Sequence, residues 1–378
     1  MKKFITLILS ALALVLPIYA TSYENLEWLE PKFAECDFAI AVLPDIQNMT
    51  RYYPDVLDNM FDWLRDSAKE RKLAFVIQLG DLTDANVTTE WMRVRDNFAK
   101  LDGILPYGFV PGNHDYYDSD TLSRNASFFN IYLPYSKHSQ ALSFGGAYEE
   151  GKMDSSYHYF AAGGIDYMVL CLEDLPRDPV VEWANKVVAD NPNRRIIVAT
   201  HTYMLPDGEY ISTDGYDIDG NAGKELWENL VSLHDNIILV LCGHMHSDDL
   251  VVRTDTGEGG NKVHQLLVDI QDMDYYQGGM GMVALLGFKN NGNDVAVNWY
   301  STKENALFKQ KNQFLFSLDS GLILPLDFGE KPDKAEPPKG AEGFGGLMPI
   351  LLALAGVAVL EIVVIGVILA RKRGKKKV

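Results

Sequence analysis

The chain has 378 residues, of which 47% are hydrophobic, enough for one large core or two smaller ones. Residues 1–20 contribute +2 and residues 347–378 contribute +5 to a net charge of −18, so residues 21–346 carry about −25. A surface this acidic repels polyanions, which excludes nucleic acid as a bulk partner.

Residues 1–20, MKKFITLILSALALVLPIYA, have the pattern of a secretory signal peptide. Lys2 and Lys3 form a positive start, an apolar stretch follows, and Ala20 completes a small-residue cleavage pattern. An uncleaved N-terminal anchor is the alternative, but the apolar stretch is short for a membrane span and Pro17 interrupts it. We therefore expect residues 1–20 to direct export, whether or not they are cleaved.

The other end of the sequence predicts a single membrane span. Residues 347–370 are apolar over a length that can cross a bilayer, with Glu361 as the one carboxylate inside it. Residues 371–378 are basic, and basic residues stay on the cytoplasmic side. A Gly-, Pro- and charge-rich linker at 329–346 precedes the span. The sequence thus predicts a single-pass protein of the cell membrane with an extracellular domain at 21–328.

Between these ends, apolar runs and helical periodicity predict an α/β fold. Buried strands are expected at 37–45, 73–81, 107–111, 195–200 and 237–242, helices at 53–70, 88–101, 178–190 and 223–233, and a hairpin at 157–173. Residues 116–155 have no clear period and are interpreted as a long insertion. The runs that continue to about residue 318 predict antiparallel strands. Alternating strands and helices followed mostly by strands indicate a two-layered sheet core with helices outside.

Each of the five predicted buried strands ends in polar residues. These endings are Asp45-Ile46-Gln47, Gly80-Asp81-Leu82-Thr83-Asp84, Gly112-Asn113-His114-Asp115, Thr200-His201 and Gly243-His244-Met245-His246. Any one of them alone is a weak signal for a site. Because sites in α/β folds form at the carboxyl ends of strands, the five together indicate one shared site.

These residue types suit two divalent cations about 3.5–4 Å apart, which can clamp a phosphate and an attacking water. Asp81 is the natural bridging carboxylate. We assign Asp45, Gln47 and His246 to the first ion and Asn113, His201 and His244 to the second. The predicted ions are Mn²⁺, Fe²⁺ or Mg²⁺, with Zn²⁺ and Ca²⁺ as alternatives.

His114 directly follows a proposed ligand, so we expect it to act as a general acid toward the leaving oxygen rather than as a ligand. Asp84, just beyond the bridging Asp81, is expected to bind the other ring nitrogen of His114. Asp115 is expected to cap the following turn. The remaining histidines outside this pattern are interpreted as structural or surface residues: His138, His158, His234 and His264.

The order Asp-x-Gln, GDxxD, GNHD, His, GHxH resembles the calcineurin-like metallophosphoesterase family over residues 37–300. The stretches "VLPDIQ", "VHQLLVDIQD" and "VNWYS" are similar to a secreted bacterial branch with glutamine in the first motif. The resemblance implies an αββα sandwich of two mixed β-sheets flanked by helices. It also implies two metal ions, small phosphorylated substrates, and in-line attack of a metal-bound water on phosphorus.

Two alternatives to this interpretation remain open at this stage. The fold could serve as a surface module that binds a phosphorylated ligand without catalysis, although the complete set of predicted ligands and His114 argue against that. Within the enzyme class, nothing in the motifs separates a phosphomonoesterase from a phosphodiesterase. Oligomeric state is likewise open.

Gln47 stands where most of the family has histidine, and this difference generates a prediction. An amide oxygen is a weaker ligand than an imidazole nitrogen and favours hard cations such as Mn²⁺, Mg²⁺ or Ca²⁺ over Zn²⁺. We expect Gln47→His to tighten metal binding at the first position, measured by titration with Mn²⁺. Equal or looser uptake in the variant would contradict this assignment.

Overall fold

The computed structural model describes residues 26–215, 219–271 and 276–327. The predicted signal peptide (1–20), linker (329–346), membrane span (347–370) and basic tail (371–378) lie outside these ranges. Within the ranges described, none of the helices has both the length and the apolar character required to cross a bilayer.

One mixed sheet carries the N-terminal motifs. Its main path runs β1 (Trp28–Leu29), β14 (Ala306–Phe308), β13 (Asp294–Ser301), β12 (Met282–Lys289), β2 (Phe38–Leu43), β3 (Leu73–Gln78) and β4 (Tyr107–Phe109). β15 (Phe314–Ser317) pairs with β13, and β16 (Ile323–Pro325) pairs with β15. Only β2, β3 and β4 are mutually parallel among these pairs, so their carboxyl ends meet at one edge.

The second mixed sheet carries the C-terminal motifs. Its order is β10 (Val251–Thr256), β11 (Lys262–Leu267), β9 (Ile237–Cys242), β8 (Arg195–Ala199), β7 (Ile165–Cys171), β6 (Ser156–Ala162) and β5 (Phe144–Ala147). β7, β8, β9 and β11 are parallel neighbours. The expectation of only antiparallel strands after β9 was therefore wrong for β11. The chain passes through β10 first, so that β11 returns beside β9 in the same direction.

Aromatic side chains pack between the two sheets. All six residues of β2 are buried, which fits a strand covered on both faces. Phe38 stacks on Phe288 of its own sheet at 4.8 Å between ring centroids and meets Tyr167 of the other sheet edge-on at 5.5 Å. Phe75 likewise packs against Phe160 across the interface, at 5.2 Å. The two sheets thus form the inner layers of a sandwich.

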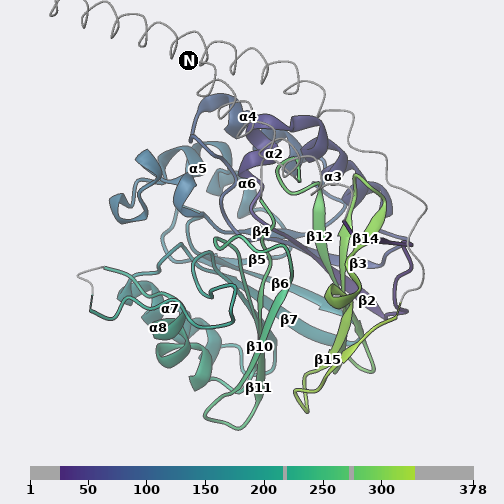
Figure 1. The fold of residues 1–378 in the computed structure, drawn as a ribbon. Helices are drawn as coiled ribbons and strands as arrows, with labels where there is room; N and C mark the ends of the chain where they lie inside the picture. The colour runs from purple at the N-terminus through teal and green to yellow at the C-terminus, as the bar shows by residue number, and fades with distance from the viewer. Residues whose placement is uncertain (1–25, 216–218, 272–275, 328–378) are drawn as a thin grey trace, which may run out of the picture. The chain divides into compact units, whose positions relative to one another are not determined.

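Helices cover the outer faces of both sheets. On the first sheet lie α2 (Gln47–Tyr52), α3 (Pro54–Ser67) and α4 (Thr88–Ala99), and on the second lie α7 (Asp178–Ala189) and α8 (Gly223–Asn229) (Figure 1). In α3, Pro54 occupies a favoured first position, and the buried residues recur on one helical stripe. The expected α/β fold of two mixed sheets with helices is confirmed.

The insertion at 116–155 contains more regular structure than its sequence predicts. It forms α5 (Ser127–Tyr132), α6 (Tyr135–His138) and the edge strand β5. Its helices are only six and four residues long, too short for a helical period to stand out in the sequence. Phe129 and Leu133 are buried in the core under the first sheet, so tertiary packing stabilises this segment.

His138 ends α6 in an aromatic setting that should make folding sensitive to acid. Its ring meets Tyr107 and Phe109 edge-on, and burial, reinforced by the neighbouring Lys137, lowers the pKa of His138 to about 4. Between pH 6.5 and 4 the unfolded chain therefore binds a proton that the folded chain does not, and the free energy of unfolding falls as the pH falls. We expect His138→Phe to reduce the loss in the free energy of unfolding between pH 6.5 and 4 by up to about 3 kcal/mol, measured in urea titrations of metal-free protein. An unchanged slope would contradict the buried neutral imidazole.

Candidate metal centre

The predicted ligands gather where the carboxyl-end edges of the two sheets meet. Asp45 follows β2 and Asp81 follows β3 in the first sheet, whereas His201 follows β8 in the second. One ligand atom from each of these three buried residues lies within 4.8 Å of the other two. Two carboxylates and an imidazole in one dry site can hold a divalent cation.

Three further contacts define the most crowded part of the cluster. The Nε2 atom of His201 and the Oδ1 atom of Asn113 are 3.2 Å apart, and His244 Nδ1 lies 3.0 Å from that oxygen and 3.2 Å from that nitrogen. Asp81 Oδ1 is 3.4 Å from His201 Nε2. Because Nδ1 of the neutral His201 ring holds its proton, Nε2 presents a lone pair here, as does the Asn113 oxygen. A metal ion, or a proton on an imidazole nitrogen, can hold such atoms together.

The charge balance at His201 supports a cation at this point. Its Nδ1–H donates to the main-chain carbonyl of Leu79 at 2.8 Å, which directs Nε2 toward the cluster. Burial alone would lower the pKa of His201, but Asp81 and Asp45 raise it well above its ordinary value. Burial, followed by the nearby Asp269, raises the pKa of Asp45. Both shifts show that the buried carboxylates attract positive charge to this point, which a divalent cation can supply.

Two glycines let the loops approach the carboxylates closely. A Cβ atom on Gly112 would overlap the main-chain nitrogen and Oδ1 of Asp81, and one on Gly243 would overlap Oδ1 of Asp45. In the same loops, Asp81 and His244 adopt positive φ angles of 48° and 72°. Backbone conformations of this kind are held in place by surrounding structure and cluster at functional sites.

Gln47 begins α2, two residues after Asp45, and its side chain is 4% exposed. Its Oε1 atom is buried and lacks a hydrogen-bond partner within the described part of the chain. An unsatisfied buried amide oxygen costs roughly 1–3 kcal/mol, which a metal ion would offset. The residues around Asp45 therefore fit a second cation with oxygen ligands.

His246 is more exposed than the other predicted ligands described above. Its side chain is 41% exposed, and its Nε2 atom is 3.3 Å from Asp248 Oδ1. Asp248 in turn lies 3.8 Å from Lys309 Nζ. The assignment of His246 to the first ion stays a prediction.

His114 lies beside the cluster with its ring partly exposed. Its main-chain N–H donates to Asp81 Oδ1 at 2.9 Å, which ties it to the predicted bridging carboxylate. Its Nδ1 atom is 2.8 Å from the main-chain carbonyl of Asp84 and 3.7 Å from the carboxylate of that residue. The Asp84 carboxylate instead pairs with Arg51. Asp84 therefore contacts His114 as expected, but through its backbone oxygen.

Asp115 has a different position from the expected cap of the following turn. Its carboxylate reaches back to accept hydrogen bonds from the main-chain N–H groups of Gly112, Leu82 and Thr83 at 2.9–3.0 Å, and from the Thr83 hydroxyl. Burial, with the neighbouring Asp81, raises the pKa of Asp115 to about 7. This side chain therefore binds the loop after β3 to the loop after β4.

Sequence reasoning missed two further buried carboxylates at strand ends of the second sheet. Asp174 follows β7 and accepts hydrogen bonds from Thr121 Oγ1 at 2.7 Å and from Thr202 N at 3.1 Å. Asp269 follows β11, and burial raises its pKa to about 7. Both end apolar runs, "YMVLCLED" and "HQLLVD", so the signal used for the other motifs could have found them.

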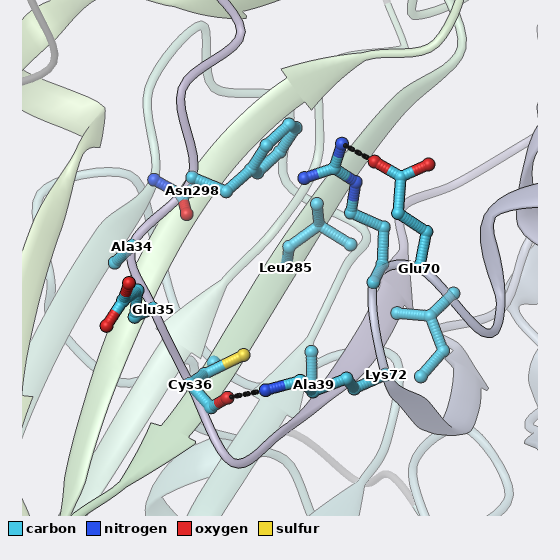
Figure 2. A pocket seen from close by; sticks show the side chains of 12 residues that line it. Ala34, Glu35, Cys36, Ala39, Glu70, Lys72, Leu285 and Asn298 are labelled. Atoms are coloured by element: carbon cyan, nitrogen blue, oxygen red, sulfur yellow. Dashed lines mark hydrogen bonds and ion pairs between the residues drawn. The ribbon is translucent and has the colours of Figure 1, made fainter.

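A separate hollow lies at the opposite edge, beside the first residues of β2 and β3 (Figure 2). Its volume is about 230 Å³, and Arg71 and Lys72 line it. Arg71 pairs with Glu70 at 2.7 Å and lies 4.2 Å above the ring centroid of Phe33, while Lys72 Nζ donates to the Cys36 carbonyl at 2.7 Å. Both cations are therefore engaged within the chain, and we assign no ligand to this hollow.

The family model of the calcineurin-like phosphoesterases matches residues 38–248, more than half of the chain and the part that carries all the predicted ligands. The chain therefore belongs to the calcineurin-like phosphoesterase family. The predicted family and a possible metal-binding group are thus confirmed.

Three individual proteins illustrate the similarity. Uncharacterized protein YvnB of Bacillus subtilis (strain 168) is 28% identical over 293 residues, which cover 73% of this chain but only 21% of YvnB. The match to the purple acid phosphatase PPD1 of yellow lupin covers 81% of this chain and 58% of the PPD1 chain, with 12% identity and a TM-score of 0.46. The match to GAP50 of Plasmodium, the anchor in the inner membrane complex, covers 83% of this chain and 95% of the GAP50 chain, with 14% identity and a TM-score of 0.42. Family membership rests on the family model.

The close approach at Gly112 generates a prediction for metal binding. We expect Gly112→Ala to displace Asp81 and to weaken Mn²⁺ binding about 100-fold in calorimetric titration, because a ligand and its supporting loop both shift. Gly151→Ala serves as a control for added backbone strain away from the site, because φ there is +92° and nothing lies within 4 Å of an added Cβ. Equal metal affinity in the two variants would show that the Gly112 contact does not support the site.

Proposed function

We propose that the protein hydrolyses phosphate esters at this cluster with the help of two divalent cations. The observation that carries the proposal is the mutual approach of Asn113 Oδ1, His201 Nε2 and His244 Nδ1 to within 3.0–3.2 Å, beside Asp81. Three potential ligand atoms in such close contact suit a shared cation. Asp45 and the unpaired Gln47 amide oxygen would hold the other ion, with Asp81 between the two.

The bound cations would supply Lewis-acid stabilisation of the phosphoryl oxygens and an activated water. Hydrolysis adds the water oxygen to phosphorus, breaks the bond from phosphorus to the ester oxygen, and leaves an alkoxide that requires a proton. His114 is placed to donate it, because the Asp84 carbonyl binds Nδ1–H and directs Nε2 away from that carbonyl. Asp115, by joining the two loops, would keep His114 and Asp81 in register.

The family to which the chain belongs supports a substrate class. A phosphate group is an anion that the acidic surface of the domain would otherwise repel, so the attraction has to be local. We propose small phosphorylated molecules as substrates, with the choice between monoester and diester left to the assay below. Mn²⁺, Fe²⁺ and Mg²⁺ remain the proposed metals.

We also propose that the enzyme works outside the cell and is tethered to the membrane. The support is the sequence alone: the signal pattern at 1–20, the apolar segment at 347–370 and the basic residues after it. Protease accessibility of a tag placed after residue 378, compared with that of the folded domain in intact cells, would test this orientation.

The catalytic prediction concerns Asp81 and His114. With added Mn²⁺, we expect Asp81→Asn to abolish hydrolysis of chromogenic phosphomonoesters or diesters. His114→Ala should lower kcat by about 10²–10⁴-fold for alkyl esters. The loss should be smaller for p-nitrophenyl esters, whose leaving group needs little protonation.

A suitable control is His234→Ala, because His234 lies before β9, at the other end of the strand from His244, and contacts Asn185. It should retain full activity. A wild-type protein that binds Mn²⁺ but hydrolyses no ester of either type would instead favour a binding module.

A further inference from the structure

An arginine and a tyrosine form an exposed stack at the end of α2. The Arg51 guanidinium carbon lies 5.0 Å from the ring centroid of Tyr52. The Arg51 side chain is 40% exposed, and Tyr52 is 44% exposed. An exposed cation–aromatic pair is a surface on which another planar group can stack.

Contacts place this stack on the His114 side of the candidate site. α2 begins at Gln47, and Arg51, four residues later, lies on the same helical face. Arg51 pairs with the carboxylate of Asp84, whose carbonyl accepts the Nδ1–H of His114. The stack is thus joined through one residue to the group that would protonate the leaving oxygen.

The backbone that carries the stack is fixed by hydrogen bonds. Arg93 Nη1 donates to the carbonyl oxygens of Thr50 and Arg51, at 2.6 and 3.1 Å, and so fixes the end of the short helix. Glu90 accepts hydrogen bonds from the main-chain N–H groups of Asp84 and Ala85, at 3.1 and 2.8 Å, and fixes the loop opposite. A ligand that binds to preorganised groups loses less free energy to ordering.

The charges around Arg51 decide what kind of group it can accept. Asp84 pairs with the guanidinium, and Glu90 lies 3.8 Å from its Nε. Two carboxylates therefore offset one cation, which disfavours a second phosphate at this position. A neutral planar group gains from stacking and meets no such repulsion.

We propose that Arg51 and Tyr52 form the leaving-group platform of the enzyme, and that its preferred substrates are phosphate esters of neutral, planar aromatic moieties such as nucleosides. This inference rests on the proposed function, since it identifies the side of the site where the alcohol departs. The phosphate would bind at the cluster and the aromatic ring would extend the Arg51–Tyr52 stack.

The test uses a matched pair of non-hydrolysable phosphonates, in which a methylene replaces the bridging ester oxygen. The phosphonate analogues of adenosine 5′-monophosphate and ribose 5-phosphate share the phosphonate and the sugar and differ in the base. In calorimetric titrations with Mn²⁺, we expect the adenosine compound to bind about tenfold more tightly, the size of a typical stacking contribution. Adding a second phosphate to it should not increase affinity.

Variants at Tyr52 establish whether the aromatic ring of the platform produces this preference. Tyr52→Ala should reduce the affinity ratio between the two phosphonates to near one, whereas Tyr52→Phe should keep it. Leu142→Ala, at a fully exposed position in the loop before β5, serves as the control and should also keep it. A wild-type ratio near one, or a ratio that survives Tyr52→Ala, would overturn the proposal. Because binding is measured without turnover, these outcomes are distinct from a failure to hydrolyse phosphate esters.

Discussion

Burial of negative charge where two sheet edges meet is the constraint on which this structure depends. Asp45 and Asp81 are both at most 1% exposed, and they share the site with the fully buried His201. Carboxylates buried so closely are costly unless a positive charge lies between them. The fold tolerates the cost because each sheet delivers its ligands at the carboxyl ends of parallel strands, where loops can converge without breaking the ladders.

The loops around the cluster are fastened to one another mainly by buried acids. Asp115 binds the loops after β3 and β4, and Asp174 joins the loop after β7 to that after β8 and to the insertion. The main-chain N–H of His244 donates to Asp45 across 199 residues of sequence. These contacts fix the positions of side chains that would otherwise lie on mobile connections.

The short helix α2 runs from the residue beside Asp45 to the exposed Arg51 and Tyr52. Gln47 at its start is buried two residues after Asp45, and Arg51 one turn later pairs with Asp84 in the loop that contacts His114. Binding of the phosphate and recognition of the leaving group would therefore share one rigid element. Changes in the loop after β3 would be expected to affect both.

The sequence by itself indicated the chemistry of the site: apolar runs end in oxygen and imidazole side chains. This local pattern predicted the five strands and the five residues that approach one another, Asp45, Asp81, Asn113, His201 and His244. It missed Asp174 and Asp269. It did not reveal that Asp115 reaches backward, that His114 contacts a carbonyl rather than a carboxylate, or that His246 lies against Asp248. Nor did it reveal that β11 pairs in parallel with β9. Only tertiary structure decided these points, because each depends on the packing and register of segments distant in sequence, whereas periodicity and residue type report only on neighbours along the chain.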